Sequence, residues 1–219
     1  TRKESSAASD VYKRQVYAHA GQKCSAASRI LIDNDVKDVF INRFNNAIED
    51  LCVGVSDNYS TLINPLISMQ DKLRVQAMAM QAKTEVLELG GEVVVDLSQS
   101  SYPGFCVGPS VFSIADNSKI SEYKIANQEV FGPILHIIGY DSIDEGIEIF
   151  NSTQYALTGG IFCQSQNDLD YILPKLEVGN IYVNRSNTGA RVAIEPFGGF
   201  KKSGTGPKAG SLEYLETLS

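Results

Sequence analysis

The sequence predicts an α/β fold in which a mostly parallel sheet is flanked by helices. Short apolar runs of strand-like composition alternate along the chain with longer segments whose apolar residues recur at helical spacing. The composition agrees, because 43% hydrophobic and 21% charged residues over 219 positions are typical of a globular chain that buries a core. We therefore expect one large domain or two small ones.

The first fifteen residues are polar and small, with no clear periodicity, and are predicted to be a tail that is foreign to the fold or disordered. A short helical turn is the alternative. From residue 16 the character changes, and residues 29–32 form an apolar strand candidate. Asp33 to Asp35 then begin a helix whose apolar positions follow helical spacing through Ile48.

The rest of the chain continues the alternation. Further strands are predicted at residues 86–89, 93–97, 111–114, 134–140, 159–163 and 181–184. Further helices are predicted at residues 69–83, 143–151 and 166–176. The segment beyond Pro196 is rich in Gly, Lys and Ser and is predicted to be mostly loop.

Charge and hydropathy narrow the range of partners. A formal net charge of -7 argues against a nucleic-acid partner, because phosphate binding needs a basic surface. No apolar run approaches the length that crosses a bilayer, and the N-terminus lacks the pattern of a signal peptide. We interpret the chain as soluble and cytoplasmic, with no membrane partner.

The cysteines and histidines do not form a metal-binding or disulfide pattern. The four cysteines contain no CxxC pair and are widely scattered, and there are only two histidines: Cys24, Cys52, Cys106, Cys163, His19 and His136. We therefore predict no metal site and a reducing environment. Any chemistry would rest on a cysteine or a carboxylate.

The run GQKCSAASR over residues 21–29 is the first segment with chemical potential. Cys24 lies among small residues between a helical stretch and a strand, so its sulfur can face a pocket with little steric cover. Its own backbone N–H, placed in a turn, could donate to the oxygen on an attacked carbon. Taken alone, a free cysteine is more often a small buried hydrophobe.

GQKC, followed by Ser-Arg with Arg29 five residues past the cysteine, is similar to the active-site signature of the aldehyde dehydrogenase family. The sequence departs from it at Val16 and Tyr17, where the family often has Ala-Phe. The resemblance implies that the Cys24 thiolate adds to an aldehyde to give a hemithioacetal. Hydride transfer to a nicotinamide then yields a thioester that water hydrolyses. The other cysteines and His19 are interpreted as packing or surface residues.

The run NQEVFGPIL over residues 127–135 is the second motif. On its own it predicts a loop that enters a strand, with a solvated glutamate. EVFGP is, however, similar to a second aldehyde dehydrogenase motif, at about the family's distance from the cysteine. The resemblance implies the cofactor NAD, with Glu129 accepting hydrogen bonds from the nicotinamide ribose hydroxyls and Phe131 packing near the ring. A carboxylate suits vicinal hydroxyls because it offers several lone pairs.

A third segment bears on the substrate. TGA at residues 188–190, PFGG at 196–199 and SGTGPKAG at 203–210 resemble the branch that oxidises L-glutamate γ-semialdehyde to glutamate in proline catabolism. This pyrroline-5-carboxylate dehydrogenase branch occurs alone or as the C-terminal part of a bifunctional proline-utilisation protein.

The resemblance assigns four residues to that small-molecule substrate. Gly189 and Ala190 would bind the substrate carboxylate, because backbone N–H groups of a Gly-Ala turn can form an anion nest. Ser25 would donate a further hydrogen bond to it, and Phe197 would pack on the aliphatic stem. Three alternatives stay open: an aldehyde dehydrogenase of other specificity, such as for succinate semialdehyde; a non-catalytic assembly module derived from one; and a glycine-rich surface loop at residues 189–199.

The resemblance spans residues 16–216 but covers less than half of such an enzyme. In the family the general base, an oxyanion-binding Asn and the Rossmann-like cofactor domain all precede the cysteine, whereas only 23 residues precede Cys24. We therefore expect a fragment whose cofactor domain is largely absent and whose own dehydrogenase activity is small, from an enzyme that is a homo-oligomer at full length. The expected organisation is a tail over 1–15, a catalytic domain over 16–184, and a substrate-anchor loop with C-terminal segment over 185–219.

Overall fold

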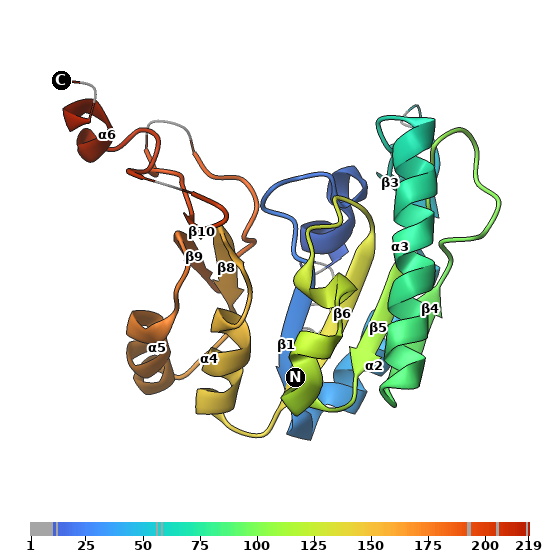
Figure 1. The fold of residues 1–219 in the computed structure, drawn as a ribbon, viewed down its shortest axis with the longest axis horizontal. Helices are drawn as coiled ribbons and strands as arrows, with labels where there is room; N and C mark the ends of the chain where they lie inside the picture. Colours follow the sequence, from blue (N-terminus) through green and yellow to red (C-terminus); the bar gives the residue numbers. More distant parts are fainter. Residues whose placement is uncertain are drawn as a thin grey trace. The chain divides into compact units, whose positions relative to one another are not determined.

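The computed structural model describes residues 11, 13–55, 57, 59–191, 194–204, 206–217 and 219. It divides into two compact units, residues 1–142 and 143–219. Both units combine helices with strands, as Figure 1 shows. The predicted α/β class is confirmed.

A four-stranded sheet forms the core of the first unit, in the order β1-β6-β5-β4. The strands are β1 (Arg29–Asp33), β4 (Glu92–Asp96), β5 (Ser110–Ile114) and β6 (Ile134–Tyr140). β1, β6 and β5 are parallel, whereas β4 pairs antiparallel with β5. All of β5 and nearly all of β6 are buried, as expected for central strands covered on both faces. The sheet is therefore mostly parallel, as predicted.

Two long helices belong to this unit, α2 (Asn34–Glu49) and α3 (Met69–Glu88). Each begins at a capping side chain, because Asp33 accepts from the N–H of Asp35 and Ser68 from that of Asp71. α3 continues to Glu88 and is capped at Leu89, so the strand predicted at residues 86–89 is wrong. Val86 continues the buried helical face, which is Val75, Ala79, Ala82 and Val86.

Shorter elements complete the first unit. They are η1 (Ala18–Gly21), β2 (Cys52–Val53), β3 (Thr61–Ile63), η2 (Asn117–Glu122) and η3 (Ile125–Asn127). Residues 13–17 are helical, and Gln15 and Val16 are buried in the core. These residues follow the helical-turn alternative. Residues 1–10 and 12, on which the predicted tail mainly rests, lie outside the described residues.

The second unit is built from short elements. They are α4 (Ile143–Asn151), β7 (Tyr155–Ala156), β8 (Thr158–Ile161), α5 (Gln166–Ile172), η4 (Leu173–Lys175), β9 (Asn180–Val183), β10 (Phe200–Lys201) and α6 (Leu212–Glu216). β8 and β9 pair in parallel, and β7 pairs with β10. The helix predicted over 166–176 changes to a 3-10 turn that contains Pro174, since proline cannot donate to the helical ladder.

The unit boundary falls at residue 142, whereas the sequence analysis divided the chain at 184. β8 and β9 pair with each other and not with the main sheet, which is why the structure separates after β6. The predicted boundary at residue 184 was based on the motifs and not on compactness, so it stays a prediction about function.

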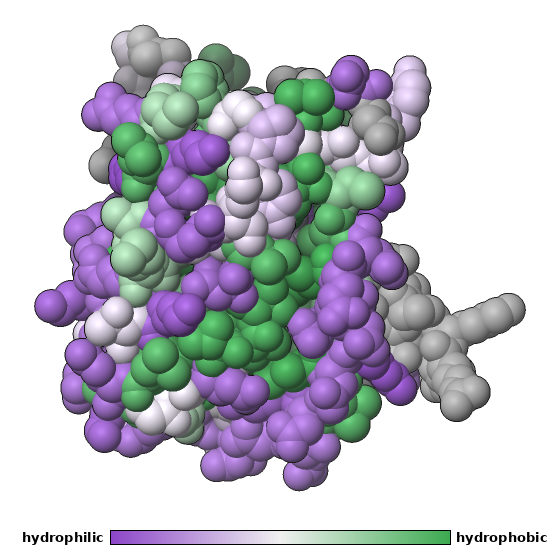
Figure 2. Space-filling view, turned by 90° about the vertical axis from the view of Figure 1, so that its right-hand side faces the viewer, coloured by the Kyte–Doolittle hydropathy of each residue, from purple (hydrophilic) through white to green (hydrophobic). Residues whose placement is uncertain are grey.

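The outward side of α3 carries several exposed apolar residues, among them Met69, Leu73, Met80 and Leu87. Figure 2 shows apolar side chains gathered on the face that carries α3 and β4. Among the described residues, no helix combines the length and hydropathy needed to cross a bilayer.

Candidate functional site

Cys24 lies in a tight turn just before β1. The N–H of Ala26 donates to the carbonyl of Lys23 over 2.9 Å, which leaves Cys24 and Ser25 at the centre of the turn. The Cys24 side chain is exposed. Its backbone N–H donates to no acceptor in the described part of the chain. The sulfur is therefore accessible, and the N–H beside it is available to an oxyanion.

The backbone that leads to Cys24 is unusual. His19, Ala20 and Gly21 have φ values of 57°, 55° and 70°, in the left-handed region that L-residues other than glycine rarely adopt. Each such non-glycine residue costs roughly 1–2 kcal/mol, and such strain is concentrated at functional sites. The segment therefore needs strong support from its neighbours.

Gln22 supplies part of that support. Its amide nitrogen donates to the carbonyl of Pro65 over 3.3 Å, and its amide oxygen accepts from the N–H of Ile67 over 3.0 Å. Both ends of one side chain thus hold the turn against the loop that precedes α3. The sequence analysis did not single out Gln22, since its partners lie more than 40 residues away.

The second motif is supported by α3. Arg74 donates to the carbonyl of Val130 over 2.7 Å and pairs with Asp71 at 3.2 Å. A Cβ on Gly132 would lie 2.7 Å from a methyl of Val75, so the turn rests directly on the helix. Phe131 has a left-handed φ of 51° and is 41% exposed. The supported backbone therefore presents an aromatic ring at the surface.

Glu129 is exposed beside this turn, and its carboxylate makes no hydrogen bond within the described residues. Ser25 is buried, and its hydroxyl likewise has no hydrogen-bond partner in the described part of the chain. Both groups are thus uncommitted.

The two motifs meet through their glycines. A Cβ on Gly21 would collide with the carbonyl of Gly132, so the two backbones are in direct contact. The strands that follow are neighbours in the sheet, and the N–H of His136 donates to the carbonyl of Ser28 over 3.0 Å. The cysteine turn and the EVFGP turn therefore lie together at the N-terminal ends of β1 and β6.

A basic pair lies beneath these turns, with His136 buried and Arg29 half-buried. Arg29 and His136 are direct neighbours across β1 and β6, and the His136 ring lies 5.6 Å from that of Phe112. Burial lowers the pKa of Arg29 to about 10. Burial and the charge of Arg29 lower the pKa of His136 to about 3, so this imidazole is neutral in the folded protein.

This pair predicts a pH dependence of stability. Because the folded pKa of His136 lies below its ordinary value of 6.5, its contribution is complete above pH 6.5 and is lost as pH falls toward 3. Each pH unit within that window costs about 1.4 kcal/mol. Urea unfolding at pH 7 and pH 4.5 should show a smaller pH effect in His136→Phe than in the wild type. Equal pH effects in both proteins would contradict the assignment.

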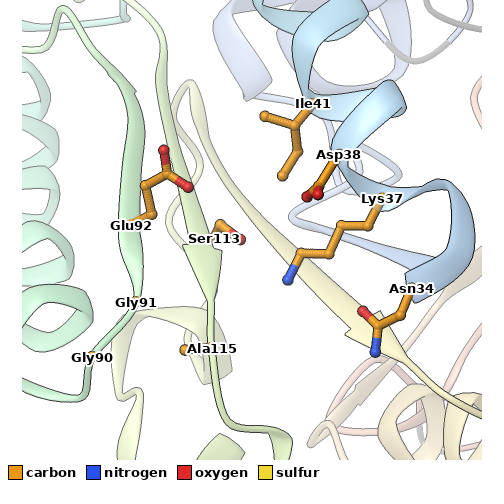
Figure 3. A pocket seen from close by; sticks show the side chains of 9 residues that line it. All are labelled: Asn34, Lys37, Asp38, Ile41, Gly90, Gly91, Glu92, Ser113 and Ala115. Atoms are coloured by element: carbon orange, nitrogen blue, oxygen red, sulfur yellow. The ribbon is translucent and has the colours of Figure 1, made fainter.

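A polar cavity of about 360 Å³ lies elsewhere in the first unit, and Figure 3 shows its lining. Its walls include Lys37 and Asp38 of α2, and Glu92 and Ser113 of the sheet. It also contacts Asn34 and Ala115, which follow the C-terminal ends of β1 and β5. The cavity is therefore at the opposite ends of the parallel strands from Cys24 and does not belong to the candidate site.

The third motif lies in the second unit. Asn180 donates to the carbonyl of Pro196 over 2.9 Å and accepts from the N–H of Gly198 over 3.3 Å, which docks the PFGG segment onto β9. Phe197 and Ala209 exchange two backbone hydrogen bonds of 3.0 Å. These two hydrogen bonds pair the PFGG segment with the end of the GTGPKAG segment. The Phe197 side chain is half-buried.

The TGA loop is open to a ligand. Gly189 is exposed with a φ of 93°, and Ala190 is partly exposed. The N–H groups of both donate to no acceptor among the described residues. Ser186 and Thr188 share a hydroxyl hydrogen bond of 2.8 Å that shapes the loop start. Free N–H groups in a left-handed turn are suited to an anion.

The predicted residues thus fall into two groups. Cys24, Ser25, Glu129 and Phe131 belong to the first unit, where the contact of Gly21 with Gly132 brings their turns together. The other three predicted residues, Gly189, Ala190 and Phe197, belong to the second unit.

Comparison with known proteins decides the family. The model of the aldehyde dehydrogenase family matches residues 4–219. The chain belongs to the aldehyde dehydrogenase family. Among curated relatives, a 1-pyrroline-5-carboxylate dehydrogenase of Geobacillus is 34% identical over 202 residues, which are 91% of this chain and 37% of the relative. This aldehyde dehydrogenase chain therefore spans little more than a third of the curated relatives' length.

Solved structures agree. A 1-pyrroline-5-carboxylate dehydrogenase from Thermus with bound NAD superimposes with a TM-score of 0.86 at 31% identity, over 97% of this chain and 39% of that one. Proline utilization A from Bdellovibrio bacteriovorus gives a TM-score of 0.84 at 34% identity, over 95% of this chain and 21% of that one. The predicted resemblance to this branch of the aldehyde dehydrogenases is confirmed.

Proposed function

We propose that this chain carries the nucleophile, the nicotinamide-side contacts and the substrate anchor of an aldehyde dehydrogenase that oxidises L-glutamate γ-semialdehyde to L-glutamate with NAD. The supporting observation is the turn that exposes Cys24 beside a free backbone N–H and against the EVFGP turn. The names of the relatives from Geobacillus and Thermus support the same substrate.

Cys24 performs the first chemical step. Its thiolate forms a C–S bond with the aldehyde carbon, and the C=O electron pair moves to the oxygen. The N–H of Cys24 donates a hydrogen bond to that oxyanion. This hydrogen bond stabilises the adduct most where water is excluded. In the resulting hemithioacetal, the carbon bonded to the Cys24 sulfur is the one that loses hydride in the next step.

The residues of the second motif fit the cofactor. The exposed carboxylate of Glu129 can accept from two ribose hydroxyls, and the exposed Phe131 ring offers a flat apolar surface to a nicotinamide. A bound NAD would supply the acceptor for the hydride that the hemithioacetal carbon must lose to become a thioester. Water then cleaves the C–S bond, which releases the carboxylate product and restores the Cys24 thiol.

The TGA loop gives the substrate its orientation. The N–H groups of Gly189 and Ala190 receive the α-carboxylate, and Ser25 adds a hydroxyl donor. Phe197 covers the aliphatic stem. An aldehyde that carries a carboxylate therefore binds more tightly than one that lacks it, which is the basis of selection.

Protection of Cys24 from alkylation tests this function on the chain itself, because adduct formation needs no cofactor. Glutamate semialdehyde should slow iodoacetamide labelling of Cys24, followed by mass spectrometry, at concentrations about tenfold lower than butanal, which lacks the carboxylate. Cys52, which is also exposed, is the internal control and should be labelled at a constant rate. Equal protection by butanal would contradict a carboxylate anchor, and stronger protection by succinate semialdehyde would favour the other aldehyde branch.

A further inference from the structure

The polar cavity of the first unit lies beyond the carboxyl ends of β1 and β5, where open parallel sheets commonly bind ligands. Its lining residues all fall between residues 34 and 115, within one compact unit. Its volume of about 360 Å³ accommodates a small metabolite. A Cβ at Gly90, on the rim, would meet nothing within 4 Å, so this side of the cavity is open to an entering ligand.

Ser113 lines the buried side of the cavity. It is only 5% exposed, and it belongs to a strand whose residues are all buried. Its hydroxyl has no hydrogen-bond partner among the described residues, and Figure 3 shows it turned toward the cavity. A buried hydroxyl usually has a partner, because leaving it unpaired costs free energy. A ligand in the cavity would supply that partner.

Lys37 brings a positive charge to the cavity. Its ammonium group donates to the carbonyl of Ile114 over 3.2 Å, which holds it at the end of β5 beside Ser113. An ammonium group has three N–H donors, so two remain for a ligand. Figure 3 shows this side chain extending from α2 toward the sheet. Lys37 and the Ser113 hydroxyl together therefore suit a carboxylate.

Two carboxylates line the same cavity, Asp38 from α2 and Glu92 from β4. Glu92 is the direct partner of Ser113 in the antiparallel register, so both side chains lie on one face of the sheet. Burial lowers the pKa of Lys37, and the charges of Asp38 and Glu92 oppose that effect, so the three charged groups are near one another. Neither carboxylate makes a hydrogen bond within the described residues. Both are therefore available to an ammonium group.

These charges select the class of ligand. Two carboxylates against one ammonium group disfavour phosphate and other multiply charged anions, whereas the fixed ammonium group of Lys37 disfavours a divalent cation. A ligand that carries one charge of each sign satisfies both sides of the cavity. Ile41, one helical turn after Lys37 on α2, adds an apolar wall.

We propose that this cavity binds a small α-amino acid with an aliphatic side chain and no net charge. The ligand carboxylate accepts hydrogen bonds from Lys37 and Ser113. Its ammonium group donates to Asp38 and Glu92. Its aliphatic side chain packs on Ile41.

The test compares three probes of similar shape by ligand-detected NMR on the chain. L-valine carries both charged groups, isovalerate lacks the ammonium group, and isobutylamine lacks the carboxylate. L-valine should bind with an apparent Kd of about 1 mM. Isovalerate and isobutylamine should each bind about tenfold more weakly, because each forgoes one set of charge-assisted hydrogen bonds.

Three variants assign the two ends of the ligand. Lys37→Met should weaken L-valine about tenfold without weakening isobutylamine, which has no carboxylate. Glu92→Gln should weaken L-valine by a similar factor, about tenfold, without weakening isovalerate, which has no ammonium group. Ser113→Ala removes the unpaired hydroxyl and should weaken L-valine about fivefold.

Lys119→Met is the matched control, because Lys119 pairs with Asp116 at 3.8 Å in the same unit and does not line the cavity. It should leave all three affinities unchanged. The proposal is overturned if L-valine does not bind, if it binds equally well to Lys37→Met and Glu92→Gln, or if uncharged glycerol or inorganic phosphate binds more tightly. The assay involves neither Cys24 nor an aldehyde, so its result is independent of the proposed function.

Discussion

Replacement of Cys24 by alanine should abolish the burst of nitrophenolate that the wild-type chain releases from p-nitrophenyl acetate. Acyl transfer to sulfur needs only an accessible thiolate and an oxyanion donor, and the exposed Cys24 with its free N–H offers both. We expect the burst rate to fall by at least about 100-fold, with loss of the acetyl adduct from the intact mass. Stopped-flow absorbance and mass spectrometry measure the two quantities.

Cys52 provides the matched control for this experiment. It is exposed like Cys24 but lies in the short strand β2, outside the motifs. Cys52→Ala should therefore keep the full burst and the adduct. If the acetyl adduct is lost in Cys52→Ala, or if the burst survives in Cys24→Ala, exposure alone accounts for the reactivity.

Gly21→Ala should be among the most destabilising single substitutions in the first unit. Its φ of 70° strains any side chain, and the new Cβ would collide with the carbonyl of Gly132, which is rigid backbone. Left-handed strain of roughly 1–2 kcal/mol and the forced separation of two turns should together cost about 3–5 kcal/mol. Urea or thermal unfolding measures the loss, and Cys24 labelling should change with it because the turn shifts.

Gly90→Ala isolates the contact from the backbone strain. Gly90 also has a positive φ, 83°, but a Cβ there would meet nothing within 4 Å. It should cost only about 1–2 kcal/mol. If the two variants lose equal stability, the contact between the cysteine turn and the EVFGP turn has no special energetic weight.

Sequence periodicity was sufficient for most of the fold. β6 and α4 lie where the sequence analysis predicts them, because each is long enough for its apolar pattern to be unambiguous. The strand predicted at residues 86–89 is wrong, since a segment of four residues with three apolar ones fits either structure and only the packing of Val86 beside Ala82 decides. The pairing of β8 with β9 apart from the main sheet depends on contacts that no local pattern encodes.

The candidate site divides in the same way. Cys24, Glu129 and the TGA loop were found from short motifs, which carry their chemistry locally. Their supports were missed, because Arg74 acts on Val130 and Gln22 on Pro65 across more than 40 residues of sequence. Arg185 and Arg191 likewise converge on Glu195 only in the folded protein, so no local motif predicts that cluster.

The central claim is that Cys24 is the nucleophile of a glutamate semialdehyde oxidation. Its most direct test is NADH formation from glutamate semialdehyde by a fusion that supplies the part of the Geobacillus relative which this chain does not match. The account predicts turnover in the fusion and a loss of at least about 1,000-fold in its Cys24→Ala variant. Turnover that persists without the Cys24 sulfur would contradict it.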